Sequence, residues 1–270
     1  MESNKIQSAL EYWHSRLSQE CGEDHILNIT LYGSQNYNID TLYSDVDVKA
    51  IYVPCLADAV LENKWTSFEF HNIQNEHCEL KDIREMCKMY QKQNLNFLET
   101  LFTEYRWDNP KYREINDAFK SRAEDIAHYN MWYGVKSTCG QALNAIKQSR
   151  NNPTDLKKFA KVIYLYLYLN KYIDGYDYRT CLRVDESERF SGFVARPLLI
   201  GLKSNDLTSF DTHQIGKFMK EIDATLNFLE EFFKNASENV KPTNDETNVW
   251  YFLRKTAFDA IMLYDGYSAV

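Results

Sequence analysis

Two acidic side chains at alternate positions mark the start of a predicted strand. Asp45 and Asp47 lie within SDVDVKAI, residues 44–51. Because successive side chains of a strand point to opposite faces, Asp45, Asp47 and Lys49 share one face, while the intervening Val and Ala side chains pack on the other. Two carboxylates this close repel each other unless a cation lies between them, and Mg²⁺ binds one or two carboxylates together with substrate phosphates. The pair therefore predicts either a magnesium site or a solvated polar face without a metal.

A calcium site of the EF-hand type is excluded. A loop that begins at Asp45 has no Gly at its sixth position, and the acids continue into a Val-rich strand instead of a loop.

A Gly-Ser pair precedes the two acids. Gly33 and Ser34 follow the apolar segment of residues 26–31, and Asp45 comes eleven residues after Ser34. A glycine lets the backbone approach a phosphate closely, and the N–H groups that follow it can bind an anion. An ordinary turn would also place Gly-Ser after a strand, so the pair indicates a phosphate site only in combination with the acids.

In combination, Gly33-Ser34 and Asp45-x-Asp47 resemble the motif of the DNA polymerase β-like nucleotidyltransferase superfamily, in which a Gly-Ser, a short helix and an Asp-x-Asp on the next strand follow one another. A longer set of positions is similar to a bacterial and phage subfamily of predicted nucleotidyltransferases: Gly33, Ser34, Tyr37, Thr41, Ser44, Asp45, Asp47 and Ile51 to Val53, with ELKDIR at residues 79–84 and NxNFLExLF at residues 94–102. The resemblance covers residues 26–105 well and the helical remainder loosely. Members of the subfamily often carry a His/Arg pattern in the C-terminal helices, where this chain has KKFAKVIY at residues 157–164, so no acceptor-binding residue is carried over.

The resemblance implies a metal site with three acids. Asp45 and Asp47 would bind two Mg²⁺ or Mn²⁺ ions, one of which also contacts the triphosphate of a nucleoside triphosphate (NTP). A third carboxylate is expected on a later strand, where Glu79 is the better match and Glu76 is the alternative. This third acid would place the second ion and accept the proton of a hydroxyl that attacks the α-phosphorus as pyrophosphate leaves.

The same resemblance implies that Gly33, Ser34, Ser44 and Lys49 bind the nucleotide, with Gly33 and Ser34 at the β- and γ-phosphates. Lys49 either approaches a phosphate or forms a salt bridge to Asp47 or another acid. Glu79 also has a second interpretation, as an exposed strand residue paired with Lys81 or another cation.

Composition narrows the choice of acceptor and compartment. The formal net charge of −8 argues against a wide basic face for long duplex DNA, because phosphate neutralisation dominates that affinity. An RNA 3′ end, a protein side chain and a small molecule remain as acceptor classes.

Six scattered cysteines without a CxxC pair predict buried thiols rather than a zinc site or a disulfide framework. The N-terminus lacks the apolar region of a signal peptide and no apolar run could cross a bilayer, so we expect a cytoplasmic protein without membrane contact.

Hydrophobic periodicity predicts an α+β fold. Strands are expected at residues 26–31, 45–53, 65–73 and 76–81, with a turn at 74–75. Helices are expected at residues 4–20, 56–63, 83–90, 95–103, 111–126, 130–149, 154–173, 211–236 and 245–264, and residues 174–210 are expected to be irregular. This gives a nucleotidyltransferase-type domain, a mixed sheet with flanking helices at residues 1–105, followed by an all-helical part at residues 106–270.

A second function class fits the same fold. The chain would then be a non-catalytic nucleotide-binding or partner-binding module, of an antitoxin-like or regulatory kind. The presence of all three acids favours the enzyme, because a decayed site would usually have lost at least one of them.

Overall fold

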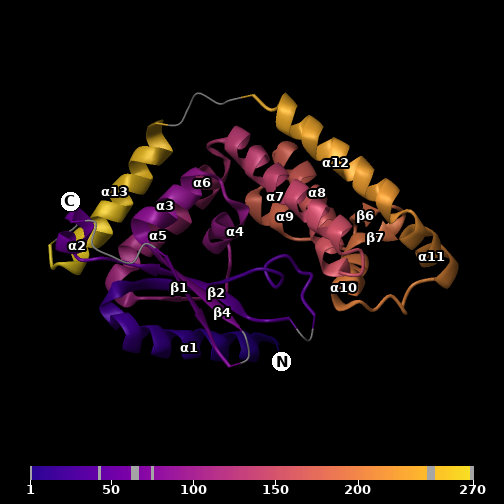
Figure 1. Cartoon of the computed structure of the whole chain (residues 1–270). Helices are drawn as coiled ribbons and strands as arrows, with labels where there is room; N and C mark the ends of the chain where they lie inside the picture. Colours follow the sequence, from indigo (N-terminus) through magenta and orange to yellow (C-terminus); the bar gives the residue numbers. More distant parts are fainter. Residues whose placement is uncertain (1, 42–43, 62–66, 74–75, 242–246, 268–270) are drawn as a thin grey trace. The chain divides into compact units, whose positions relative to one another are not determined.

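The computed structural model describes the chain except residues 1, 42–43, 62–66, 74–75, 242–246 and 268–270 (Figure 1). The chain divides into two compact units, each discontinuous in sequence. The first contains residues 1–33, 45–130 and 244–270, and the second contains residues 34–44 and 131–243. This division differs from the predicted boundary after residue 105, because helices on both sides of that boundary pack with the sheet.

A five-stranded mixed sheet forms the centre of the first unit. In spatial order its strands are β3 (Ser67–His71), β4 (His77–Asp82), β2 (Asp47–Tyr52), β1 (Ile26–Tyr32) and β5 (Arg106–Asp108). β2 runs antiparallel to β1 and parallel to β4, and both outer strands are antiparallel to their neighbours. β2 and β4 can be parallel because the chain between them is long enough for a crossover and includes α2 (Leu56–Val60) and β3.

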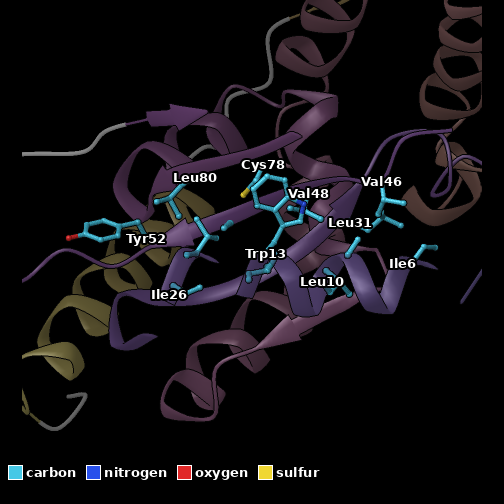
Figure 2. Close-up of a cluster of buried hydrophobic side chains, with 14 residues drawn as sticks. Ile6, Leu10, Trp13, Ile26, Leu31, Val46, Val48, Tyr52, Cys78 and Leu80 are labelled. Carbon is cyan, nitrogen blue, oxygen red and sulfur yellow. The ribbon is translucent and has the colours of Figure 1, made fainter. Parts of the chain in front are cut away.

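One face of the sheet packs on α1 (Glu2–Cys21), which lies along it in Figure 1. The apolar side chains of α1 recur at helical spacing, and they are between 0% and 4% exposed: Ile6, Leu10, Trp13 and Leu17. All four belong to one cluster with residues of β1, β2 and β4. In Figure 2, Leu10 and Trp13 lie beside Leu31 of β1 and Val48 of β2. α1 therefore supplies one side of the apolar core that it forms with the sheet.

The strand alternation predicted for β2 is confirmed. Val48 and Ala50 are 0% exposed and belong to the core against α1. Asp47 and Lys49, one position removed from each, consequently face the opposite side of the sheet.

Helices cover this opposite face (Figure 1). They are α3 (Ile83–Gln91), α4 (Leu95–Leu98), a 3-10 turn (Glu99–Leu101), α5 (Arg113–Ser121), α6 (Ala123–His128) and α13 (Thr247–Tyr264). α3 begins where the Asp82 carboxylate accepts a hydrogen bond from the N–H of Arg84 at 2.8 Å, so Asp82 is its N-cap. α13, the last helix of the chain, packs against α2, α3 and α5.

The second unit is built from helices and one small hairpin. These are α7 (Met131–Asn151), α8 (Leu156–Ile173), α9 (Tyr178–Leu182), β6 (Arg189–Phe190), β7 (Phe193–Val194), α10 (Ala195–Ser204), α11 (Thr212–Lys220) and α12 (Ile222–Asn239). α8 is central and packs against α7, α9, α10 and α12. Tyr164 and Tyr168 are 4% and 2% exposed, so they serve as core residues of this unit. None of the helices in the described ranges is long and apolar enough to cross a membrane.

The predicted α+β class, with an N-terminal mixed sheet and a helical C-terminal part, is confirmed. β5 was not predicted, because three residues are too few to show a period. The segment expected to be irregular, residues 174–210, contains α9, the hairpin and α10. The predicted turn at residues 74–75 and the ends of the predicted elements at 56–63 and 65–73 lie outside the described residues.

Replacing Trp13 tests the packing of α1 on the sheet. We expect Trp13→Ala to lower the free energy of unfolding by about 3–5 kcal/mol, because it opens a large cavity between α1 and the strands. Urea unfolding followed by circular dichroism measures the change. Glu11→Ala, on the exposed side of the same helix, should change stability by less than about 0.5 kcal/mol. Equal losses in the two variants would contradict this packing.

Candidate functional site

The polar face of the sheet in the first unit carries side chains in two cross-strand rows. In the first row, Tyr32 of β1 lies opposite Asp47 of β2, and the N–H of His77 in β4 donates to Asp47 Oδ1 at 3.0 Å. In the second row, Lys49 of β2 lies opposite Glu79 of β4. The rows are two residues apart along each strand, so their side chains share one face.

Asp47 occupies the first position of β2 and is half-buried, while Asp45 is exposed just before the strand. Burial raises the pKa of the Asp47 carboxyl, and the charges of Asp45 and Glu76 add to the rise, against a hydrogen bond from the N–H of His77 that lowers it. A bound cation would favour the ionised form of such a carboxyl, because it offsets both desolvation and like-charge repulsion. The two predicted acids therefore lie within electrostatic reach of each other.

The turn after β1 is built on Gly33. Its φ is +99°, which L side chains rarely adopt, and a Cβ placed there would meet nothing within 4 Å. The Gly33 N–H donates to the carboxylate of Glu99 at 2.8 Å, and Glu99 is 0% exposed. The group that the resemblance would direct at a phosphate is thus bound to a buried acid, so Gly33 contributes mainly the backbone conformation of the turn.

Ser34 and Ser44 belong to the second unit, within the loop of residues 34–44. Their hydroxyl oxygens are 3.5 Å apart, and the Ser44 oxygen accepts a hydrogen bond from the N–H of Thr41 at 2.9 Å. Residues 34–38 form turns, whereas the resemblance implies a short helix here. The structure therefore groups these two serines with each other in the second unit.

The loop of residues 34–44 is anchored to helices of the second unit. Arg196 and Lys203 of α10 donate to the backbone carbonyls of Asn38 and Ile39 at 2.9 and 2.8 Å. The ring of Tyr37 stacks on Tyr164 of α8 with 4.4 Å between the ring centroids. These contacts hold residues 37–39 of the loop within the second unit.

Glu79 lies between two lysines. Lys49 Nζ donates to Glu79 Oε2, and Lys81 Nζ is 3.0 Å from Glu79 Oε1. Burial by itself would raise the pKa of the Glu79 carboxyl, but the two ammonium groups outweigh it and hold that pKa below its ordinary value. Lys49 was expected either to approach a phosphate or to form a salt bridge. The structure has the salt bridge, and the acid that Lys49 pairs with is Glu79 instead of Asp47.

Glu76, the alternative third acid, precedes β4 and is 8% exposed. The Asn72 amide donates to Glu76 Oε2 at 2.8 Å, and the Glu76 N–H donates to the Asn72 side-chain oxygen at 2.9 Å. Its charge contributes to the raised pKa of Asp47, so Glu76 also lies within electrostatic reach of the two acids.

The Asp45 and Asp47 carboxylates fit the oxygen ligands that Mg²⁺ prefers, and Mg²⁺ commonly fills its other positions with waters and substrate phosphates. Across the described ranges of the chain, no group of three or more His, Cys, Asp or Glu side chains is arranged to hold a metal ion. The fit is therefore that of two carboxylates completed by a substrate, and it does not extend to Glu79.

Two residues next to these groups, His77 and Glu99, were not predicted to matter, whereas the predicted pairing of Glu79 with Lys81 is present. His77 could have been found, because it shares the strand alternation of Glu79 in β4. Glu99 offered no such signal, since it stands in an apolar run and its partner, the Gly33 N–H, is set only by the fold.

Comparison of the chain with protein-family models and with curated protein sequences finds no match.

Two glycine substitutions test the role of the turn at Gly33. We expect Gly33→Ala to lower the free energy of unfolding by about 1–2 kcal/mol, through backbone strain alone, because the added methyl group meets no atom. Gly140→Ala adds the same methyl group on the exposed side of α7, again without a contact, and should raise stability by about 0.5–1 kcal/mol. Thermal unfolding of both variants measures the difference, and a stabilising effect of Gly33→Ala would contradict the positive φ.

Proposed function

We propose that the chain is a Mg²⁺-dependent nucleotidyltransferase, which moves a nucleoside monophosphate from an NTP to a hydroxyl acceptor and releases pyrophosphate. The observation that carries the proposal is the position of Asp47 at the start of β2, opposite Tyr32, the residue that leads into the Gly33 turn. A glycine turn and a pair of acids thus lie at the same end of two adjacent strands. A bound triphosphate with its divalent cation would need both features, a turn that phosphates can approach closely and carboxylates that bind the cation.

The chemistry follows from those groups. Asp45 and Asp47 would hold Mg²⁺, which when bound supplies positive charge for the phosphoryl oxygens and the leaving pyrophosphate. The absence of a side chain at Gly33 leaves open space beside the turn. The acceptor oxygen forms a bond to the α-phosphorus, the bond from that phosphorus to the bridging oxygen breaks, and the hydroxyl proton passes to solvent.

The acceptor belongs to one of three classes: an RNA 3′ end, a protein side chain or a small molecule. The net charge of −8 weighs against long duplex DNA. The proposal gives nucleotide contacts to the turn at Gly33 and none to Lys49, because Lys49 is bound to Glu79.

Label transfer tests the activity. The full chain is incubated with Mg²⁺ or Mn²⁺, each labelled NTP in turn, and a cell extract that supplies acceptors. We expect Asp45→Asn and Asp47→Asn each to lower transfer by about 1,000-fold, because loss of a metal ligand removes several kcal/mol of transition-state stabilisation. A chelator should abolish transfer by the wild type.

Asp117→Asn provides the control, since Asp117 is an exposed acid on α5 of the same unit. It should transfer label at the wild-type rate. No transfer by the wild type, or equal transfer by Asp45→Asn, would contradict the proposed activity.

A non-catalytic nucleotide-binding or partner-binding module is the second candidate, and one observation favours it. The Gly33 N–H and the Glu79 carboxylate, two groups that the resemblance assigns to the reaction, are both engaged with other protein groups. Calorimetry of NTP binding with and without Mg²⁺ separates the candidates. Metal-independent binding that Asp47→Asn leaves unchanged would favour the module.

A further inference from the structure

Three charged side chains next to the two acids form a closed cluster on the polar face of the sheet. Lys49 is 3% exposed and Lys81 is 8% exposed, and the side chain of Glu79 is 14% exposed. Each carboxylate oxygen of Glu79 faces one ammonium group, and Lys81 also donates to Ser67 Oγ at 3.1 Å. With two ammonium groups and one carboxylate, the cluster carries a net charge of +1.

Aromatic rings fix the position of the Lys49 ammonium. It lies over the Tyr32 ring at 4.1 Å and over the Phe97 ring at 4.2 Å from the centroids. Lys81 lies over the same Phe97 ring at 5.2 Å. Because the ring faces are electronegative, they add to the attraction of the Glu79 carboxylate. The Lys49 charge is therefore held in place, two residues from Asp47 on the same face of β2.

Glu79 is badly placed to bind a second divalent ion. It would have to release at least one ammonium group, and the released group would remain buried without its counter-ion, which is strongly unfavourable. A second ion beside the Glu79 carboxylate would also meet a cluster that is already positive. Of the acids that the resemblance implies, Asp45 and Asp47 remain for a metal ion, whereas Glu79 is committed to two lysines. The alternative third acid, Glu76, accepts a hydrogen bond from the Asn72 amide.

We propose that Glu79 is the counter-ion of Lys49 and Lys81 and not a metal ligand, and that the first unit binds one divalent cation, on Asp45 and Asp47. The fixed ammonium of Lys49 then provides a second positive charge on the face where a two-metal site would hold a second ion. The count of one ion rests on the proposed nucleotidyl transfer, whereas the counter-ion role of Glu79 rests on the ion pairs alone.

The first experiment measures thermal unfolding in metal-free buffer with a chelator. Loss of a counter-ion leaves two buried ammonium groups, so we expect Glu79→Gln to lower the Tm by about 10 °C. If Glu79 belonged to a cluster of metal-binding acids, removal of its charge would relieve repulsion and leave the Tm unchanged or raised. Glu69→Gln is the matched control, because Glu69 is the exposed residue opposite Glu79 on β3, and its Tm should stay within about 2 °C of wild type.

A second variant keeps the test decisive if Glu79→Gln folds poorly. In Glu79→Gln/Lys49→Met the carboxylate and its nearest ammonium are removed together, so we expect most of the lost Tm to return. A double variant as unstable as Glu79→Gln alone would overturn the counter-ion role.

The second experiment counts bound Mn²⁺ by electron paramagnetic resonance in the presence of a non-hydrolysable NTP analogue. We expect one Mn²⁺ per wild-type chain, one for Glu79→Gln/Lys49→Met, and none for Asp47→Asn. Two ions per wild-type chain, or loss of Mn²⁺ from the folded double variant, would overturn the proposal. A wild type that binds no Mn²⁺ would contradict the proposed function and the single-ion count together, and the Tm comparison would still decide the role of Glu79.

Discussion

The burial of the Lys49 ammonium is the constraint on which the polar face of the sheet depends. An ammonium that is 3% exposed costs several kcal/mol in lost hydration unless other groups replace the water. Here a carboxylate from β4 and rings from β1 and α4 replace it, so three elements must be in register around one atom. A slip of β2 by one residue would turn the Lys49 side chain into the apolar core against α1. The cost of that burial sets the register of β2, and the register determines which other side chains of β2 lie on the polar face.

The parts of the fold that could be predicted are those whose signal is local. The spacing of Ile6, Leu10 and Trp13 reports a buried helix face, and the alternation around Asp47 reports a two-sided strand, because each pattern repeats within a few residues. β5 has only three residues and no period of its own, so only its pairing with β1 defines it.

The same distinction applies to the candidate site. The alternation around Asp47 was sufficient to predict that Asp47 and Lys49 share the face of β2 opposite the core. The Lys49 partner of Glu79 and the Glu99 partner of the Gly33 N–H were not predictable in this way, because the residues of these two contacts are 30 and 66 positions apart. Sequence spacing could also not show that the Gly-Ser pair is divided, with Gly33 in the first unit and Ser34 in the second.

The first unit is completed by the last helix of the chain. α13 packs against α2, α3 and α5, the Tyr264 hydroxyl is 2.7 Å from His25 Nε2, and the Cys87 thiol donates to the Leu253 carbonyl at 3.4 Å. A ribosome releases the chain from its N-terminus, so all five strands of the sheet emerge long before this helix does. Throughout that interval the part of α3 that packs against α13, around Cys87, is uncovered. A nascent chain that stalls before residue 247 therefore exposes this apolar part of α3 to chaperones and to other nascent chains, although every strand of the sheet has already been synthesised.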